Sequence, residues 1–190
     1  MTGSGGLRRC ANERISQMGE FRHGCHLLRS TNNEVPTDRY DDASGGGWMT
    51  IHEDHPRRES LLSRQMIVDA QNNGLLADSA LIALGRGEAF DYLLQERTCE
   101  AARQAILACA AYLSSAEHPV ISVNGNTVAL AGPELLACAA VLGCPIEVNI
   151  YYRTPERMSA LLSALDVQKI EAGDAYPDLK SKIEVVEILG

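Results

Sequence analysis

The fold is decided by two short apolar stretches, PVISVNGN at residues 119–126 and IEVNIYY at residues 146–152. Both are rich in β-branched residues, and the second alternates apolar with polar residues, as a half-buried strand does. A third apolar stretch covers residues 183–189. Sequence long enough for a helix separates each stretch from the next, which predicts a parallel sheet with right-handed crossovers.

The chain before the first strand has helical rather than strand signals. Apolar residues recur at helical spacing there, and we expect Asp78 and Thr98 to cap helices and Asn73-Gly74 to end one. Farther along the chain, Gly143 should end a helix and Thr154-Pro155 should start one. The expected helices cover residues 58–73, 78–84, 88–96 and 98–115, followed between the strands by 133–143 and 154–165. The predicted fold class is therefore α/β: a Rossmann-like three-layer arrangement with a mostly parallel sheet and an N-terminal helical part.

Composition divides the 190 residues into two parts. Residues 1–48 are rich in glycine and polar residues and balance six arginines with six acidic residues, so the net charge of −8 lies in residues 49–190. We interpret 1–48 as a disordered leader or as an over-called gene start, with the native start at Met49. Residues 49–190 suffice for a single α/β domain with a modest core.

Several classes of function are disfavoured by composition. The acidic balance argues against nucleic-acid binding, and no apolar run reaches the ~18 residues of a membrane span. The six cysteines form no CxxC pair, so we expect no metal site and a reducing cytoplasmic location. Every lysine lies near the C-terminus, which leaves arginine, histidine or backbone amides to bind an anion in the main body.

A dense charged stretch, Gly85-Arg86-Gly87-Glu88-Ala89-Phe90-Asp91-Tyr92, points to an anion site. We expect the two glycines to form a turn that lets the backbone approach a bound group, with Arg86 directed at it. Amides at the start of the next helix would face the same anion. The pattern is not a dinucleotide fingerprint, because Phe90 stands where the third glycine belongs, and no GxxxxGK[ST] loop is present.

The stretch from Leu81 to Leu94 resembles the signature block of the archaeal phosphopantothenate synthetases (4-phosphopantoate–β-alanine ligases). Further blocks in the same order resemble that family too: His55-Pro56-Arg57, Ser60 to Arg64, Ala116 to Asn126, and Glu147 to Thr154.

Two departures from the family accompany this resemblance. Leu84 occupies a position where the family usually carries histidine. The family also continues beyond the point where this chain stops, with an acidic Glu-Asp-Gly-Asp-Arg type segment and an Asp-Leu-Asn-Pro-Leu-Ser-Arg type segment that contributes to the nucleotide site. We therefore expect a C-terminally truncated member of the family.

The resemblance implies a cytoplasmic, homodimeric ligase that uses ATP and Mg²⁺ in coenzyme A biosynthesis. In the implied reaction, the carboxylate of 4-phosphopantoate attacks the α-phosphorus of ATP, giving an acyl-adenylate and pyrophosphate. The amine of β-alanine then displaces AMP to form 4′-phosphopantothenate. The alternative is a truncated homologue that folds, dimerises or binds substrate without turnover.

By resemblance, Arg64 and Arg86 are the positions that contact ATP, and Gly85 and Gly87 flank the second of them. From chemistry we add Glu88 and Asp91 as catalytic candidates that orient the β-alanine ammonium or the hydration shell of Mg²⁺. For either carboxylate, a helix N-cap is the competing interpretation.

The expected substrate-binding residues are His55, Arg57 and Arg153 for the phosphate or carboxylate of 4-phosphopantoate, and Asn124 and Asn126 for its hydroxyls or the product amide. The charged residues have solvated surface charge as their alternative. For the two asparagines the alternative is a tight Asn-Gly-Asn turn. Because Asn124 and Arg153 each follow a predicted strand, both should lie at the carboxyl edge of the sheet, where ligands bind in such folds.

Overall fold

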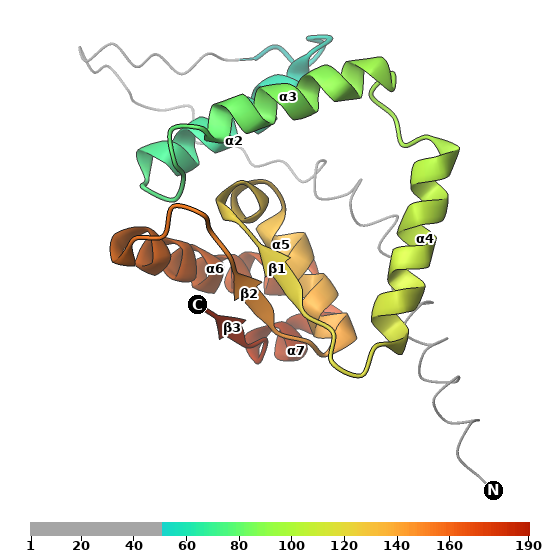
Figure 1. Cartoon of the computed structure of the whole chain (residues 1–190), viewed down its shortest axis with the longest axis vertical. Helices are drawn as coiled ribbons and strands as arrows, with labels where there is room; N and C mark the ends of the chain where they lie inside the picture. The colour runs from blue at the N-terminus through green and yellow to red at the C-terminus, as the bar shows by residue number, and fades with distance from the viewer. Residues whose placement is uncertain (1–50) are drawn as a thin grey trace, which may run out of the picture.

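The structure is a computed structural model that describes residues 51–190. Our interpretations of residues 1–48 lie outside the described residues. Within them, the α/β fold class is confirmed: a small parallel sheet is interleaved with helices (Figure 1).

The sheet holds three parallel strands in the order β1-β2-β3. They are β1 (Ile121–Val123), β2 (Ile146–Val148) and β3 (Ile188–Leu189), with Ile121 opposite Ile146 and Ile146 opposite Ile188. The third strand is shorter than predicted, because Ile183 belongs to a helix and packs into the core from there. The apolar run at 183–189 thus contributes to both a helix and a strand. The periodicity of so short a run does not distinguish the two.

Two long helices, α5 (Gly125–Leu142) and α6 (Pro155–Ala175), pack against the sheet and each other, followed by the 3₁₀ helix η1 (Pro177–Leu179) and α7 (Lys180–Glu184). Figure 1 shows α5, α6 and α7 on one side of the sheet. The sheet residues facing away from them are exposed. The fully buried large side chains of this main core are Val128, Leu136, Leu142, Ile146, Val148, Leu161, Leu165 and Ile183.

Helix α5 starts earlier than predicted and is kinked. It begins at Gly125, and Ala131 (φ −150°) breaks its geometry two residues before Pro133. Pro133 has no N–H, so regular bonding cannot continue there. The Gln168 side chain of α6 donates from Nε2 to the Val128 carbonyl at 3.0 Å and satisfies a carbonyl next to the kink. Helix α5 is long and apolar enough to cross a membrane, but half of it is buried within the fold, and that core role accounts for its composition.

The N-terminal helical part consists of α2 (Arg58–Asn72), α3 (Ala80–Leu93) and α4 (Glu100–Ser115). Helices α2 and α3 pack together around a second, smaller core of Ile67, Ala70, Leu76 and Ala80. Most of helix α4 lies apart from the rest of the fold (Figure 1), and its C-terminal end reaches the main core through Leu113. It leaves Ile106 and Tyr112 exposed by 56% and 77%.

The predicted Gly85-Arg86-Gly87 turn is wrong. Helix α3 runs without interruption through these residues, and neither glycine has a positive φ. Each glycine costs a helix interior about 1 kcal/mol relative to alanine, and the packing of Leu81 and Leu84 against the smaller core offsets this. The amides expected to face an anion are therefore inside the helix.

Candidate functional site

The carboxyl edge of the sheet is shaped by the start of α5. Asn124 directly follows β1 and is the N-cap of α5: its side chain accepts from the Thr127 amide at 3.0 Å, and the Thr127 hydroxyl bonds back to the Asn124 amide at 3.3 Å. This capping box satisfies two amides that the first turn leaves free. Asn124 is thus a helix cap at the sheet edge.

The loop between α2 and α3 closes onto this edge. The Asn126 side chain donates from Nδ2 to the Ala80 carbonyl at 3.2 Å, tying α5 to the start of α3. Gly125 lies so close to the loop that a Cβ there would meet the Leu76 side chain at 2.5 Å and the Leu75 carbonyl oxygen at 3.0 Å. The glycine that permits a close backbone approach is therefore Gly125, and neither Gly85 nor Gly87 is near another group.

Arg157 is a residue that the sequence analysis did not single out. Its guanidinium donates to the Leu75 carbonyl at 3.4 Å and to the Tyr152 carbonyl, so it joins the α2–α3 loop to the segment after β2. Nothing in the sequence could indicate this contact, because the two segments lie 82 residues apart. Its neighbour Arg153, a predicted substrate residue, is exposed.

The N-terminus of α6 lies at the same edge but already carries its own carboxylate. Thr154 caps it as predicted by accepting from the Arg157 amide at 3.3 Å. The Glu156 carboxyl has a lowered pKa because its own backbone amide and the Thr154 side chain donate to it. A negative group near a helix N-terminus is stabilised by the free amides there, so this terminus is no open anion site.

The strongest polar cluster lies instead between the start of α2 and the middle of α3. Arg57, directly before α2, forms an ion pair with Glu88 of α3. The Tyr92 hydroxyl donates to the same Glu88 oxygen at 2.6 Å, and the Arg57 guanidinium lies over the Tyr92 ring, 5.7 Å from its centre. We call these three residues the Arg57–Glu88–Tyr92 cluster. It unites one predicted substrate residue with one predicted catalytic residue.

The electrostatics of the cluster favour its charged state. The pKa of Glu88 is lowered, first by the Tyr92 hydroxyl and then by Arg57, because both donate to the ionised carboxylate. The pKa of Arg57 is raised by its hydrogen bond to Glu88. Glu88 is 19% exposed and Arg57 54% exposed, so a solute can reach the arginine more readily than its partner.

The remaining predicted residues are exposed on the same helices. Arg64 lies on α2, and Arg86, Gly85, Gly87 and Asp91 lie on α3. Successive helical residues turn by about 100°, so Arg86 points about 160° away from Glu88. Neither Arg64 nor Arg86 has a hydrogen-bond or ion-pair partner within residues 51–190. Two unpaired guanidinium groups suit the phosphates of a nucleotide.

His55 is the last predicted substrate residue, and it lies in the turn before α2. Its Nδ1 accepts from the Arg57 amide at 3.0 Å. His55 therefore shapes the backbone that presents Arg57.

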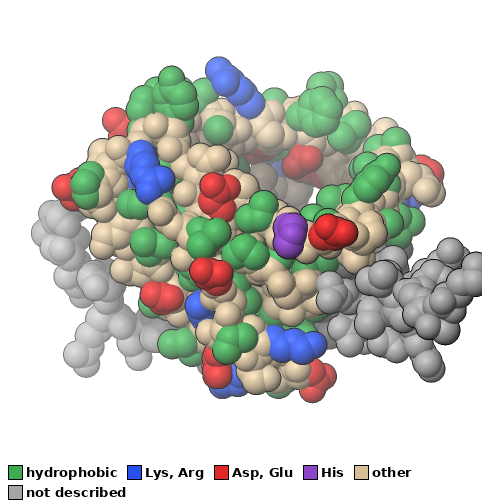
Figure 2. Space-filling model, turned by 60° about the horizontal axis from the view of Figure 1, so that its bottom comes forward, with side chains coloured by type: hydrophobic (Ala, Val, Ile, Leu, Met, Phe, Trp, Pro, Cys, Tyr) green, Lys and Arg blue, Asp and Glu red, His purple; other side chains and the backbone are tan. Residues whose placement is uncertain are grey.

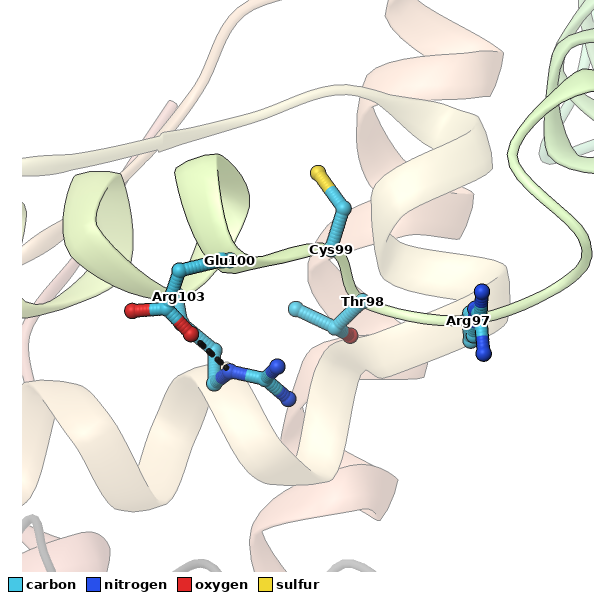
Figure 3. Close-up of a pocket in the computed structure, with 5 residues that line it drawn as sticks. All are labelled: Arg97, Thr98, Cys99, Glu100 and Arg103. Carbon is cyan, nitrogen blue, oxygen red and sulfur yellow. Dashed lines mark hydrogen bonds and ion pairs between the residues drawn. The ribbon is translucent and has the colours of Figure 1, made fainter.

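A pocket elsewhere in the described chain contains none of the predicted residues. Figure 3 shows it at the start of α4, lined by Arg97, Thr98, Cys99, Glu100 and Arg103. Arg103 donates to Glu100 at 3.0 Å, so the charge of one of the two arginines in the pocket is neutralised. Arg97 lies apart from that pair (Figure 3). Thr98 was predicted to cap α4, but Cys99 holds the cap position and makes no side-chain cap bond.

The charge of the surface is mixed. On the face seen in Figure 2, acidic and basic side chains are interspersed among hydrophobic ones, and Lys and Arg do not gather into a patch. Within residues 51–190, no three His, Cys, Asp or Glu side chains group as metal ligands do.

Comparison with known proteins adds to this geometry. Residues 101–187 match the profile of the phosphopantothenate/pantothenate synthetase family. The chain is 46% identical over 117 residues to the 4-phosphopantoate–β-alanine ligase of Thermococcus kodakarensis, and 47% identical over 115 residues to that of Methanospirillum hungatei.

These matches cover 62% and 60% of the chain, but only 45% and 47% of the two relatives. The chain thus spans just under half the length of the curated relatives it matches. Asn124, Asn126 and Arg153 lie within the family range, whereas the Arg57–Glu88–Tyr92 cluster, Arg64 and Arg86 lie before it.

Proposed function

Because residues 101–187 match the profile of the phosphopantothenate/pantothenate synthetase family, we propose that the chain acts in an ATP-dependent ligase. This ligase condenses 4-phosphopantoate with β-alanine, through an acyl-adenylate, to 4′-phosphopantothenate, AMP and pyrophosphate. The observation that carries the proposal is the 46% identity over 117 residues to the 4-phosphopantoate–β-alanine ligase of Thermococcus kodakarensis. We further propose a cytoplasmic homodimer, as the resemblance implies.

The charges of the site suit such a reaction. ATP and 4-phosphopantoate are anions, and the described part of the chain offers them Arg57, Arg64 and Arg86 as exposed guanidinium groups. Arginine remains charged at all relevant pH values and can hold phosphate bidentately. Glu88 supplies the carboxylate for the β-alanine ammonium. Mg²⁺ would enter with the ATP phosphates, since it is bound largely by phosphate and water rather than by a full protein cage.

A homologue that folds and binds 4-phosphopantoate without turnover is the second candidate. The observation that favours it is the coverage: the matched part of the chain corresponds to 44–47% of each relative. In that case the arginines bind the acid, and adenylation requires residues that the matched part of the chain does not supply.

AMP release separates the two candidates. The purified protein is given ATP, Mg²⁺, 4-phosphopantoate and β-alanine, beside Arg86→Ala and a control, Arg97→Ala, whose arginine lies outside the proposed site. Turnover predicts AMP only with both acid and amine, a loss of about 100-fold or more in Arg86→Ala, and little change in Arg97→Ala. Binding of 4-phosphopantoate without AMP supports the second candidate. A folded protein that neither binds the acid nor releases AMP contradicts both.

A further inference from the structure

We propose that the Arg57–Glu88–Tyr92 cluster is a charge latch that couples the binding of the two substrates. The anionic acid takes Arg57 from Glu88, and the freed carboxylate then accepts the ammonium of the amine. This inference rests on the proposed function, because it requires one anionic and one cationic substrate at the same site.

The contacts within the cluster show that each charged group occupies the other. Glu88 accepts from Arg57 and from the Tyr92 hydroxyl through one and the same oxygen, Oε1. While this arrangement holds, Arg57 offers less of its charge to a phosphate, and Glu88 offers less of its charge to an ammonium. Neither substrate meets a fully available partner.

The two halves of the latch are held in place in different ways. Glu88 and Tyr92 stand four residues apart on one face of α3, so the helix fixes their relative position. Arg57 precedes α2 and belongs to a run of turns held by short-range bonds, among them His55 Nδ1 to the Arg57 amide at 3.0 Å. Its side chain is also 54% exposed. Arg57 is therefore the group that moves, and the carboxylate with its tyrosine is the part that stays.

Tyr92 has a place in both states. In the structure, it donates to Glu88 and lies under the Arg57 guanidinium. After Arg57 leaves, the Tyr92 hydroxyl still donates to the carboxylate and keeps it ionised and oriented. The free site would thus consist of a carboxylate and an aromatic ring, and both attract an ammonium group.

Such an exchange makes the binding of the two substrates mutually favourable. An ion pair as exposed as Arg57–Glu88 is weak, so breaking it changes the affinity for a substrate by only about two- to fivefold. We therefore expect β-alanine to bind about two- to fivefold more tightly when 4-phosphopantoate is saturating.

Calorimetric titration of the full chain without ATP tests the latch. Glu88→Gln should bind 4-phosphopantoate about two- to fivefold more tightly, because Arg57 is no longer held, and bind β-alanine about tenfold more weakly. Arg57→Gln should lose most affinity for 4-phosphopantoate while its β-alanine affinity no longer depends on the acid. The matched control is Glu100→Gln, which removes the partner of Arg103 on α4 and should change neither affinity.

The opposite signs in Glu88→Gln are decisive, since a purely structural role would weaken both ligands. Weakening of both, or an unchanged affinity for 4-phosphopantoate, overturns the latch while AMP release still supports the ligase. If the wild-type chain binds neither 4-phosphopantoate nor β-alanine and releases no AMP, the proposed function fails and the latch fails with it.

Discussion

At the residue scale, the glycines separate into two kinds that the sequence does not distinguish. Gly85 and Gly87 sit inside α3 with open space around each, whereas Gly125 and Gly132 are pressed against other side chains. At Gly132, a Cβ would lie 1.9 Å from the Gln168 side-chain oxygen. The glycines that drew attention in the sequence are thus dispensable for packing, and those that packing requires lie in α5.

This contrast predicts opposite changes in stability. Gly85→Ala and Gly87→Ala should each raise the free energy of unfolding by up to about 1 kcal/mol. Gly125→Ala should lower it by about 1–3 kcal/mol, because the new methyl group overpacks against Leu75 and Leu76. Urea unfolding measures both. A loss of AMP release in the stabilised variants would support contact of these glycines with ATP, and a destabilised Gly85→Ala would contradict the open surroundings of the helix.

The Glu88 carboxylate predicts a pH dependence of stability. Its pKa is lowered in the folded state, so its stabilising contribution is present above the pKa of the unfolded chain and is lost as pH falls through the folded-state value. We expect wild type to have a higher melting temperature than Glu88→Gln at pH 7, with the difference shrinking as pH falls below about 4. Thermal melts from pH 7 to pH 3 measure it, and a constant difference would exclude the ionised pair as its cause.

At the element scale, the sheet edge is built from helix starts. Asn124 caps α5 and Thr154 caps α6, each directly after a strand or its following loop. Polar residues at this edge therefore stabilise the helices whether or not they bind a ligand. A loss of activity on substitution says little until the cap has been separated from the contact.

Asn124 allows that separation. Asn124→Ala should destabilise the protein by about 1 kcal/mol through loss of the capping box, and Asn124→Ser should retain most of the stability because serine is also a good cap. Chemical denaturation supplies the stability and substrate titration the affinity. If Asn124→Ser keeps the stability but loses affinity for 4-phosphopantoate, Asn124 is a ligand contact; if both are kept, the cap is its function.

At the scale of the whole molecule, burial is unevenly distributed. The main core lies between the sheet and helices α5–α7, a smaller core lies between α2 and α3, and α4 contributes little to either. Nine consecutive apolar residues, from Ala105 to Leu113, form most of α4. A helix apolar on all sides is normally buried, which is consistent with the proposed dimer.

Truncations in the two regions should therefore differ sharply. Leu161→Ala in α6 should lower the free energy of unfolding by about 2–5 kcal/mol, because it empties a fully buried position. Ile106→Ala in α4 should cost less than about 0.5 kcal/mol in the dilute monomer. Urea unfolding at low protein concentration checks both. A large cost at Ile106 that grows with protein concentration would show that another copy covers α4.

Local signals predict the strands β1 and β2, the helices that follow them, and two helix caps, Gly143 at the end of α5 and Thr154 at the start of α6. Strand-forming residues at 121–123 and 146–148 predict a parallel sheet because helical sequence joins them, and Thr154-Pro155 predicts the start of α6, since both signals are local. The prediction from sequence failed at Gly85-Arg86-Gly87. The glycines there predict a turn locally, but the packing of α3 against α2 maintains a helix.

Which polar residues meet depends on how the helices pack. Arg57 and Glu88 lie 31 residues apart, and Arg157 and Leu75 lie 82 apart. Their contacts depend on how α2, α3 and α6 pack, a global property that no local propensity encodes. The sequence supplied Arg57 and Glu88 as separate candidates for an anion and a cation, and the fold placed them against each other.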